Sequence, residues 1–300
     1  MRFNERNILV LSGSADKDHV NDGDEYYRIE PLSDDYERSK GGNSFVFKAI
    51  DSDEVEYIVK FCKFPNIARY KKQNNRFQQE IDVLDQANEE GCEHVIKFYF
   101  SGFKKIEETG NYHHYYVMEK GDQDLRSFLL NNNLPNNQKY FLCYDIIKGI
   151  EELHAMGYYH RDIKPDNIFI VNQGTANNWK IGDLGLSIHQ DDNSRKLEFQ
   201  EKIGPIGWLS PEVTNKFLCE GTPYEGQFDC RIDAKSDVFQ LGKLLWYIFQ
   251  NNIPVGQVTF EDFKVKNKIL FDLLFEMLQY NKTRRKSLSH YSEEFELLSN

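Results

Sequence analysis

Long apolar runs are missing from this sequence of 300 residues, and none reaches the length of a membrane span. The first residues, Met1 to Asn4, do not begin a secretory signal peptide. Internal repeats and low-complexity linkers are missing as well. We therefore expect a cytoplasmic protein that does not bind a membrane.

Cysteine is scarce and shows no pattern. The chain has five cysteines, and no two of them form a Cys-x-x-Cys pair. An odd number of scattered cysteines indicates reduced thiols, and it points to neither a zinc site nor a disulfide framework. The five are Cys62, Cys92, Cys143, Cys219 and Cys230.

Positive charge is in deficit. Lys and Arg number 37 against 48 Asp and Glu, which gives a formal net charge of −11. This charge argues against broad nucleic-acid binding and slightly favours basic protein substrates. The contents of 28% charged and 40% hydrophobic residues are typical of a soluble globular chain, and the length allows one large domain or two lobes.

What the chain does contain is a compact group of polar side chains between Tyr158 and Asn167. Asp162 could accept a proton, Lys164 could meet a phosphate and Asn167 could hold a divalent metal. Pro165 fixes φ and removes a backbone donor, which predicts a rigid loop rather than a helix. A base and a metal ligand this close together suit phosphoryl transfer, in which positioning and charge neutralisation contribute most of the catalysis.

The flanking segments predict how this loop is held. A helix with one apolar stripe is predicted from Lys139 to Met156. Gly157 is typical of a helix end in the left-handed conformation. The apolar run from Ile168 to Val171 predicts a short buried strand.

The segment from His160 to Asn167 resembles the catalytic loop of eukaryotic-type protein kinases. A plainer interpretation, in which His160 is a satisfied core histidine and Asp166 a turn residue, suits those two positions. It does not account for Asp162, Lys164 and Asn167 together. The resemblance implies an enzyme that uses ATP with Mg²⁺ or Mn²⁺ to phosphorylate protein substrates.

The resemblance also implies an α+β fold of two lobes. The small lobe would be a mainly antiparallel sheet with one key helix, and the larger lobe would be mainly helical. Residues 1–25 are predicted to be an N-terminal extension that packs at most through Ile8 to Leu11. The kinase domain is expected over residues 26–295, with an N-lobe of about 26–119, a hinge of about 119–122 and a C-lobe of about 123–295.

A strand is predicted from Phe45 to Ile50 because its residues alternate with a period of two. Together with the turn before it, this segment resembles the kinase glycine-rich loop that covers the nucleotide, with Val46 aligned. Only Gly41 falls on a family glycine, and Ser39 and Ser44 occupy the other two glycine positions. An ordinary hairpin turn explains the segment nearly as well.

Lys60 points to the same side as Ile58 in the apolar strand predicted from Tyr57 to Phe61. A buried lysine is costly unless it is paired, and the candidate partner is Glu80, in a helix predicted from Arg76 to Leu84. By resemblance, Lys60 is the phosphate-binding lysine and Glu80 its helix partner. Ile58 then stands where the family usually has a small residue over the adenine.

Further nucleotide contacts come from the resemblance alone. Met118 would line the back of the adenine pocket, although a core methionine explains it equally well. The backbone from Glu119 to Gly121 would meet the adenine, and Phe169 is also assigned to the nucleotide site. The sequence Asp183-Leu184-Gly185 resembles the family's metal-binding motif, so Asp183 would hold Mg²⁺ together with Asn167.

The segment from Gly204 to Glu212 resembles the family's Ala-Pro-Glu region, with Ser210 in place of alanine. Glu212 is expected to be buried against Arg285, and Arg284 is the competing partner if the alignment slips by one residue.

Two more helices are predicted in the C-terminal part. An apolar helix from Asp233 to Phe249 carries Asp237, which by resemblance would hold the backbone of the catalytic loop. A final amphipathic helix is predicted from Leu270 to Leu278.

Three functional readings stay open. An active protein kinase is favoured because the whole catalytic set is present, namely Lys60, Glu80, Asp162, Lys164, Asn167 and Asp183. A pseudokinase scaffold is the alternative, because Ser39, Ser44 and Ile58 could weaken ATP binding. A small-molecule kinase of related fold would typically lack the Pro-Glu segment and its arginine.

Two sequence features give opposite indications of whether the enzyme phosphorylates serine/threonine or tyrosine. Lys164 is the serine/threonine mark and touches the chemistry, so we expect serine/threonine specificity. Pro205, Ile206 and Trp208 look like a tyrosine-kinase substrate platform, which leaves tyrosine or dual specificity as the alternative. The sequence does not indicate an oligomeric state.

Regulation is predicted from the loop before Glu212. Ser194 is the one suitable phosphorylation site there, because Ser187 follows the metal motif too closely. The usual phosphorylation position falls on Glu201, whose single charge could partly replace a phosphate and pair with Arg161. A solvated glutamate beside Lys202 is the plainer interpretation.

Overall fold

The computed structural model describes residues 1–4, 8–14, 16–32, 44–173, 176–191 and 207–299. The chain separates into two compact units. The first unit comprises Met1–Gly91 and Ile96–Lys120, and the second comprises Cys92–Val95 and Gly121–Asn300. The predictions that concern Ser39, Gly41, Ser194, Glu201, Pro205 and Ile206 lie outside the described residues.

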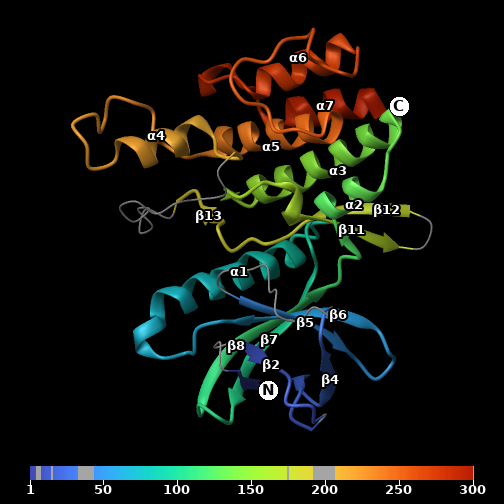
Figure 1. The fold of residues 1–300 in the computed structure, drawn as a ribbon, viewed down its shortest axis with the longest axis vertical. Helices are drawn as coiled ribbons and strands as arrows, with labels where there is room; N and C mark the ends of the chain where they lie inside the picture. Colours follow the sequence, from blue (N-terminus) through green and yellow to red (C-terminus); the bar gives the residue numbers. More distant parts are fainter. Residues whose placement is uncertain (5–7, 15, 33–43, 174–175, 192–206, 300) are drawn as a thin grey trace. The chain divides into compact units, whose positions relative to one another are not determined.

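The first unit is built on a six-stranded antiparallel sheet in the order β3-β4-β5-β6-β8-β7 (Figure 1). Its register pairs Val46 with Lys60 and Lys60 with Tyr116, so Lys60 lies on a central strand. The strands are β3 His19–Asp22, β4 Glu25–Glu30, β5 Ser44–Ile50, β6 Glu56–Cys62, β7 Phe98–Ile106 and β8 Asn111–Glu119.

One face of this sheet carries the helix α1, Lys71–Glu89, which a short 3-10 turn η1, Ala68–Tyr70, precedes. Phe77 of α1 lies 5.4 Å from the His114 ring and 5.3 Å from the Tyr116 ring, measured between centroids. The helix therefore packs on β8 through an aromatic contact. It is longer than the predicted segment because its polar first turns follow no apolar pattern.

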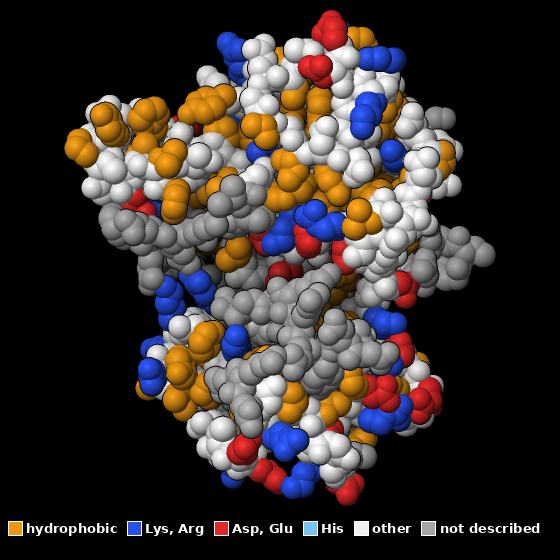
Figure 2. All heavy atoms as spheres, viewed as in Figure 1, with side chains coloured by type: hydrophobic (Ala, Val, Ile, Leu, Met, Phe, Trp, Pro, Cys, Tyr) orange, Lys and Arg blue, Asp and Glu red, His pale blue; other side chains and the backbone are white. Residues whose placement is uncertain are grey.

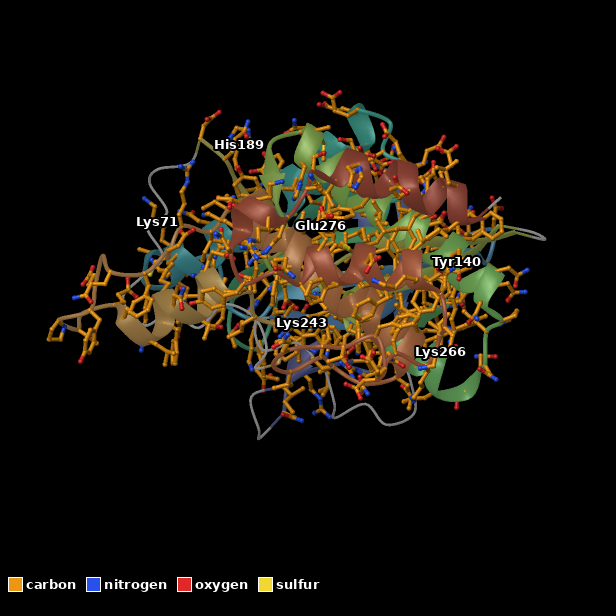
Figure 3. The ribbon with its side chains drawn as sticks, turned by 90° about the horizontal axis from the view of Figure 1, so that it is seen from above. Lys71, Tyr140, His189, Lys243, Lys266 and Glu276 are labelled. Atoms are coloured by element: carbon orange, nitrogen blue, oxygen red, sulfur yellow. The ribbon has the colours of Figure 1, made fainter. Side chains whose placement is uncertain are left out.

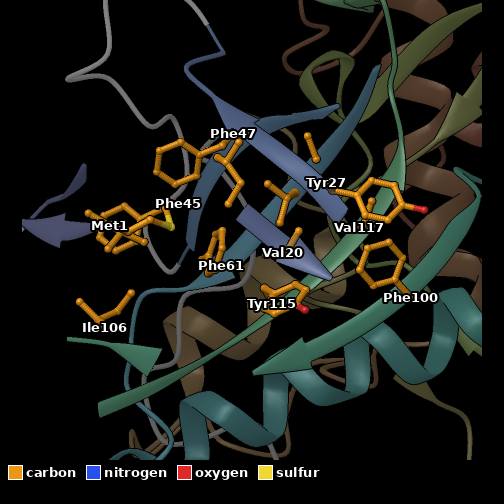
Figure 4. Packing of buried hydrophobic residues seen from close by; sticks show 14 residues of the cluster. Met1, Val20, Tyr27, Phe45, Phe47, Phe61, Phe100, Ile106, Tyr115 and Val117 are labelled. Atoms are coloured by element: carbon orange, nitrogen blue, oxygen red, sulfur yellow. The ribbon is translucent and has the colours of Figure 1, made fainter. Parts of the chain in front are cut away.

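The other face of the sheet encloses an aromatic core (Figure 4). Phe47, Phe61 and Tyr115 are at least 95% buried, and the rings of Phe47 and Phe61 meet edge to face at 5.9 Å. The structure differs here from the sequence expectation, because Met1 and Val20 join this core in addition to the Ile8 to Leu11 segment. The short strands β1 Arg2–Phe3 and β2 Leu9–Val10 pair with each other.

The second unit is mainly helical. Its helix α3 packs against α7 and α5, and α5 packs against α6. Figure 3 shows Tyr140, Lys243 and Glu276 among the side chains of these helices. The helices are α2 Leu125–Asn131, α3 Asn136–Ala155, α4 Pro211–Cys219, α5 Ala234–Gln250, α6 Lys268–Met277 and α7 Leu288–Ser299.

The prediction of a last helix near Leu270 is correct for α6, but α6 is not the final helix, because α7 follows it. The helix α5 begins where expected, since Asp233 and Ser236 form a reciprocal capping box at its start. Asn251 ends α5 with a φ of 56° in the left-handed region. A short 3-10 turn η3, Lys282–Arg284, links α6 to α7.

A small sheet in the second unit carries the loops of interest. The strand β11, Ile168–Gln173, pairs antiparallel with β12, Ala176–Ile181, and with β9, Gln123–Asp124. The strands β10, Tyr158–Tyr159, and β13, Ile188–His189, pair with each other. Among the described residues, the helices are all too short or too polar to cross a membrane.

Candidate active site

The loop after α3 is held by a buried carboxylate. Gly157 leaves the helix with a φ of 84°, as predicted. Oδ2 and Oδ1 of Asp237 then accept the backbone N–H groups of His160 and Arg161 at 2.7 and 2.9 Å. The predicted role of Asp237 as an anchor therefore agrees with its contacts.

Sequence reasoning missed two other anchors of this loop. His154 places Nε2 2.9 Å from Oδ2 of Asp237. Burial would raise the pKa of Asp237, but the contacts with His154, together with His160 and the N–H of Arg161, hold the pKa below its ordinary value. Gln240 accepts from the backbone N–H of Ile163 at 3.3 Å and donates to the carbonyl of Arg161. Its position three residues after Asp237, on the same helix face, was the available signal.

Asp162 lies at the centre of the loop with its two carboxylate oxygens in different surroundings. Its Oδ2 accepts from Nζ of Lys164 at 2.6 Å and from Nδ2 of Asn167 at 2.9 Å. Its Oδ1 is buried and has no hydrogen-bond partner within the described part of the chain. The loop therefore brings the three predicted residues together and leaves one carboxylate oxygen for an incoming donor.

Two residues of the site have unusual backbones. Arg161 and Asp183 have φ values of 68° and 54°, in the left-handed region that non-glycine residues rarely adopt. Each costs on the order of 1–2 kcal/mol relative to the right-handed conformation. Strain of this kind is found where the surrounding structure fixes a functional side chain.

Asn167 and Asp183 lie at the same end of the β11–β12 hairpin. Ile168 pairs with Ile181, and the N–H of Gly182 donates to the carbonyl of Asn167 at 2.9 Å. Asp183 follows directly and is exposed.

This end of the hairpin fits a hard cation. Asn167 uses its amide nitrogen to hold Asp162, which leaves its oxygen Oδ1 as a possible ligand. The carboxylate of Asp183 supplies oxygen as well, and oxygen is what Mg²⁺ and Mn²⁺ prefer. Within the described residues, no three His, Cys, Asp or Glu side chains form a cluster that could hold a metal by themselves. Asn167 and Asp183 therefore suit a metal ion whose remaining ligands are phosphate oxygens.

His160 and Asp166 differ in how far they match the plainer interpretation. His160 is fully buried and its Nδ1 accepts from the N–H of Asp162 at 3.2 Å, but its Nε2 has no partner among the described residues, so it is only half satisfied. Asp166 lies in the 3-10 turn η2, Pro165–Asn167, as a turn residue would. It also accepts two hydrogen bonds from Arg126 of α2, at 2.7 and 2.9 Å, which the sequence did not indicate.

In the first unit, the predicted pair of Lys60 and Glu80 is formed. Nζ of Lys60 lies 2.7 Å from Oε1 of Glu80, and the two side chains are only 11% and 4% exposed. A lysine held in this way presents a fixed positive charge. Ile58, on the same strand, is buried, while Val46 opposite Lys60 is partly exposed.

The other residues assigned to nucleotide binding are divided between the units. Met118 and Glu119 end β8 in the first unit, and Gly121 and Phe169 belong to the second. A Cβ atom on Gly121 would lie 2.7 Å from Cβ of Phe169, so only glycine allows this close approach.

A buried ion pair secures the segment that begins α4. The guanidinium of Arg285 lies 2.9 and 3.2 Å from the two carboxylate oxygens of Glu212, and both residues are 2% exposed. The first alignment is therefore correct, and the alternative partner Arg284 is exposed. Ser210 caps α4, because its Oγ accepts from the N–H of Val213.

Ser187 lies four residues after Asp183 and is 1% exposed. Its hydroxyl oxygen has no hydrogen-bond partner among the residues that the structure describes. Its N–H donates to the carbonyl of Leu184 at 2.9 Å, which closes the turn before β13. Burial is therefore the physical reason why this serine is a poor modification site.

Comparison with known proteins adds an independent finding. Residues 39–299 match the sequence family described as "Protein kinase domain". The chain is 24% identical over 222 residues to the dual specificity protein kinase Ttk of Danio rerio. The aligned region covers 73% of this chain and 21% of that protein. The chain is 26% identical over 219 residues to the serine/threonine-protein kinase dst2 of Dictyostelium discoideum, which covers 72% and 16%.

A third similarity is higher but shorter. The chain is 33% identical over 144 residues to the serine/threonine-protein kinase/endoribonuclease IRE1 of Oryza sativa subsp. japonica, which covers 47% of this chain and 14% of that protein. In these three comparisons the aligned part spans about a fifth or less of the relative's own length.

Proposed function

Because the chain belongs to the protein kinase domain family, we propose that it transfers the γ-phosphoryl group of ATP to serine or threonine hydroxyls of protein substrates. The surroundings of Asp162 carry this proposal. Lys164 and Asn167 fix one carboxylate oxygen, and the other oxygen is buried without a partner in the described chain. An acceptor prepared in this way suits a substrate hydroxyl, whose proton it would accept as the oxygen attacks phosphorus.

The remaining residues have separate tasks in this proposal. Lys60, held by Glu80, meets the phosphates of ATP with a fixed positive charge. Lys164 donates to Asp162, and its positive charge would also stabilise the transferring phosphoryl group. Asn167 and Asp183 would hold a divalent cation, which when bound neutralises charge on the phosphates.

Serine/threonine preference is the finer part of the proposal. It rests on Lys164, which contacts the proposed base directly at 2.6 Å. The names of the relatives include both serine/threonine and dual specificity kinases, so they favour neither strongly. Trp208, which favours the tyrosine alternative, is 3% exposed and stacks edge to face on Tyr247 of α5. A buried tryptophan is a core residue rather than an open substrate platform.

The test is mass spectrometry of a peptide library incubated with the protein and Mg-ATP. We expect phosphoserine and phosphothreonine in the wild-type reaction. Asp162→Asn should lower the single-turnover rate by roughly 10²–10⁴-fold, because the base is lost while the shape is kept. Asp272→Asn is the matched control, since Asp272 is exposed on α6 and should leave the rate unchanged.

Nucleotide binding separates an enzyme from a scaffold. A ligand present at 100 times its dissociation constant stabilises the folded state by about 2.7 kcal/mol. Both the wild type and Asp162→Asn should therefore show a rise in Tm with Mg-ATP. No rise in either protein would support the pseudokinase scaffold instead, and wild-type turnover by Asp162→Asn would refute the role given to Asp162.

A further inference from the structure

The first unit has a strong local excess of positive charge within a negatively charged chain. Between Tyr57 and Gln79 the sequence has six basic residues and no acidic one, although the whole chain carries a net charge of −11. Lys60 is buried and paired with Glu80. The other five are partly or fully exposed, and they are Lys63, Arg69, Lys71, Lys72 and Arg76.

Specific contacts fix this basic segment on the β7–β8 hairpin. Nδ2 of Asn74 donates to the carbonyls of Pro65 and Tyr70, both at 3.0 Å, which ties the loop before α1 to the helix itself. The N–H of Asn66 donates to the carbonyl of Tyr112 in β8 at 2.7 Å. The loop, the first turns of α1 and the hairpin thus form one surface within the first unit.

Three large apolar side chains of this surface are exposed. Phe103 is 52%, Tyr112 51% and Ile67 42% exposed. Phe103 stacks on His114 with 4.4 Å between the ring centroids. Burial lowers the pKa of His114 to about 4, so that ring is neutral at pH 7 and adds apolar area rather than charge.

The strand register places charge beside these rings. Lys105 pairs with Tyr112, and Phe103 pairs with His114, on neighbouring positions of one sheet face. Because successive side chains alternate between the two faces of a strand, these four residues share the face on which α1 packs.

Most of the positive charge here is not neutralised from within the described chain. Arg69, Lys71 and Lys105 make no ion pair with any residue that the structure describes, and Arg69 lies over the Tyr70 ring at 5.4 Å. The acidic residues at the hairpin tip are engaged elsewhere. Glu107 pairs with Lys17, and Glu108 accepts from the N–H of Phe3.

Figure 2 shows hydrophobic and basic side chains side by side on the left of the first unit. Exposed apolar groups next to unpaired cations are the features by which protein surfaces bind acidic peptide segments. The six residues that define this basic face are Ile67, Arg69, Lys71, Phe103, Lys105 and Tyr112.

We propose that the basic face binds an acidic segment of a partner protein, one that carries an apolar or aromatic side chain between its carboxylates. The carboxylates meet Arg69, Lys71 and Lys105, and the apolar side chain packs on Phe103 and Tyr112. Charge complementarity selects this occupant, because the segment from Tyr57 to Gln79 has six basic residues and no acidic one. Nucleic acid is less suited, since an extended polyanion reaches beyond this face and meets the rest of a chain whose net charge is −11, whereas a short acidic segment does not.

The experiment is fluorescence anisotropy with a labelled peptide that has Asp and Glu on both sides of one phenylalanine. We expect saturable binding that weakens as salt is added. The double change Lys71→Glu with Lys105→Glu should weaken binding by roughly tenfold or more, because two attractions become repulsions. Tyr112→Ser should weaken it without any change of charge.

The matched control is Lys266→Glu with Lys286→Glu, which gives the same net charge from two exposed lysines of the second unit. It should leave binding unchanged, as should replacement of Asp162 by Asn, because Asp162 belongs to the second unit and the six residues of the basic face belong to the first. Each variant is checked by its Tm. The proposal is wrong if the control pair weakens binding as much as the test pair does, if Gln and Asn can replace the peptide's acids, or if single-stranded RNA of equal charge binds more tightly than the peptide.

Discussion

At the scale of single residues, the pair of Arg285 and Glu212 shows how much one buried contact can contribute. Arg285 is 2% exposed and donates to Glu212 and to the carbonyls of Gln279, Lys235 and Tyr280. Its removal leaves a buried carboxylate without a counter-charge, which is one of the costliest changes in a folded protein.

We therefore predict that Arg285→Met lowers the free energy of unfolding by about 3–5 kcal/mol. Arg284→Met is the control at the neighbouring position, where the exposed side chain should change stability by no more than about 0.5 kcal/mol. Urea denaturation of both variants measures the difference. Equal effects of the two substitutions would contradict the importance given to the buried pair.

A second prediction at this scale concerns pH. Burial raises the pKa of Asp145 to about 6, although His94 and the N–H of Trp179 act to lower it. The folded state thus binds this proton more readily than the unfolded chain, whose ordinary pKa is 3.8. The carboxylate is a cost to stability above pH 6, and that cost is relieved as the pH falls through 6 toward 4.

Asp145→Asn removes this cost, because it keeps the shape and carries no charge. We expect the variant to be more stable than the wild type at a pH of about 8, with the advantage shrinking below a pH of about 6. Urea midpoints across this range measure it. Glu293→Gln, at an exposed position of α7, is the control. Its stability relative to the wild type should stay the same across this pH range. A wild type as stable as the variant at high pH would contradict the raised pKa of Asp145.

At the scale of elements, the sequence predicted those with a regular apolar pattern. The strands β5 and β6 and the helices α3, α5 and α6 were found within a few residues of their predicted bounds. The helices α2, α4 and α7 were not predicted. The seven residues of α2 are too few to establish a helical period. In α7, Leu288, Tyr291 and Phe295 do stand at helical spacing, so a signal was present that the sequence reasoning missed.

The candidate site was predictable to the degree that its residues are neighbours in the sequence. Asp162, Lys164 and Asn167 fall in one loop, so the chain alone brings them together. Arg126 contacts Asp166 across 40 positions, and His154 contacts Asp237 across 83, so only the fold reveals them. No local pattern records such pairs.

Gly149 of α3 lies where the helix packs closely against β12 and the segment near His94. A Cβ on Gly149 of α3 would lie 2.5 Å from Cγ1 of Ile181 and 2.8 Å from the carbonyl oxygen of His94. Alanine normally favours a helix over glycine by about 1 kcal/mol. We predict the reverse here, with Gly149→Ala destabilising by about 1–3 kcal/mol because backbone atoms must move.

Thermal unfolding measures this effect, and Asn137→Ala at an exposed position of α3 provides the control. The control should be neutral or slightly stabilising, as helix propensity alone requires. A stabilised Gly149→Ala would mean that β12 and the segment near His94 pack less closely on α3 than described.

At the scale of the whole molecule, the two units have separate cores and different fluorophores. All three tryptophans, Trp179, Trp208 and Trp246, belong to the second unit. The first unit is rich in tyrosine and phenylalanine but contains no tryptophan. Tryptophan emission therefore reports on the second unit, whereas circular dichroism reports on both.

We predict that Phe61→Ala, a fully buried position in the first core, destabilises that unit by about 3–5 kcal/mol. It should shift part of the circular dichroism transition to lower denaturant and leave the tryptophan transition in place. Leu244→Ala in α5 should shift the tryptophan transition instead. Coincident shifts of both probes would show that the two units unfold as one.

Ser187 has a consequence for how modification of this chain would be interpreted. Its hydroxyl is buried, and its N–H closes the turn before β13. An enzyme can reach that oxygen only after the turn has come apart, so the rate of labelling is limited by how often the turn opens. The amount of phosphate found on Ser187 would then report how often the segment beside Asp183 unfolds locally, rather than a regulatory modification of the folded chain.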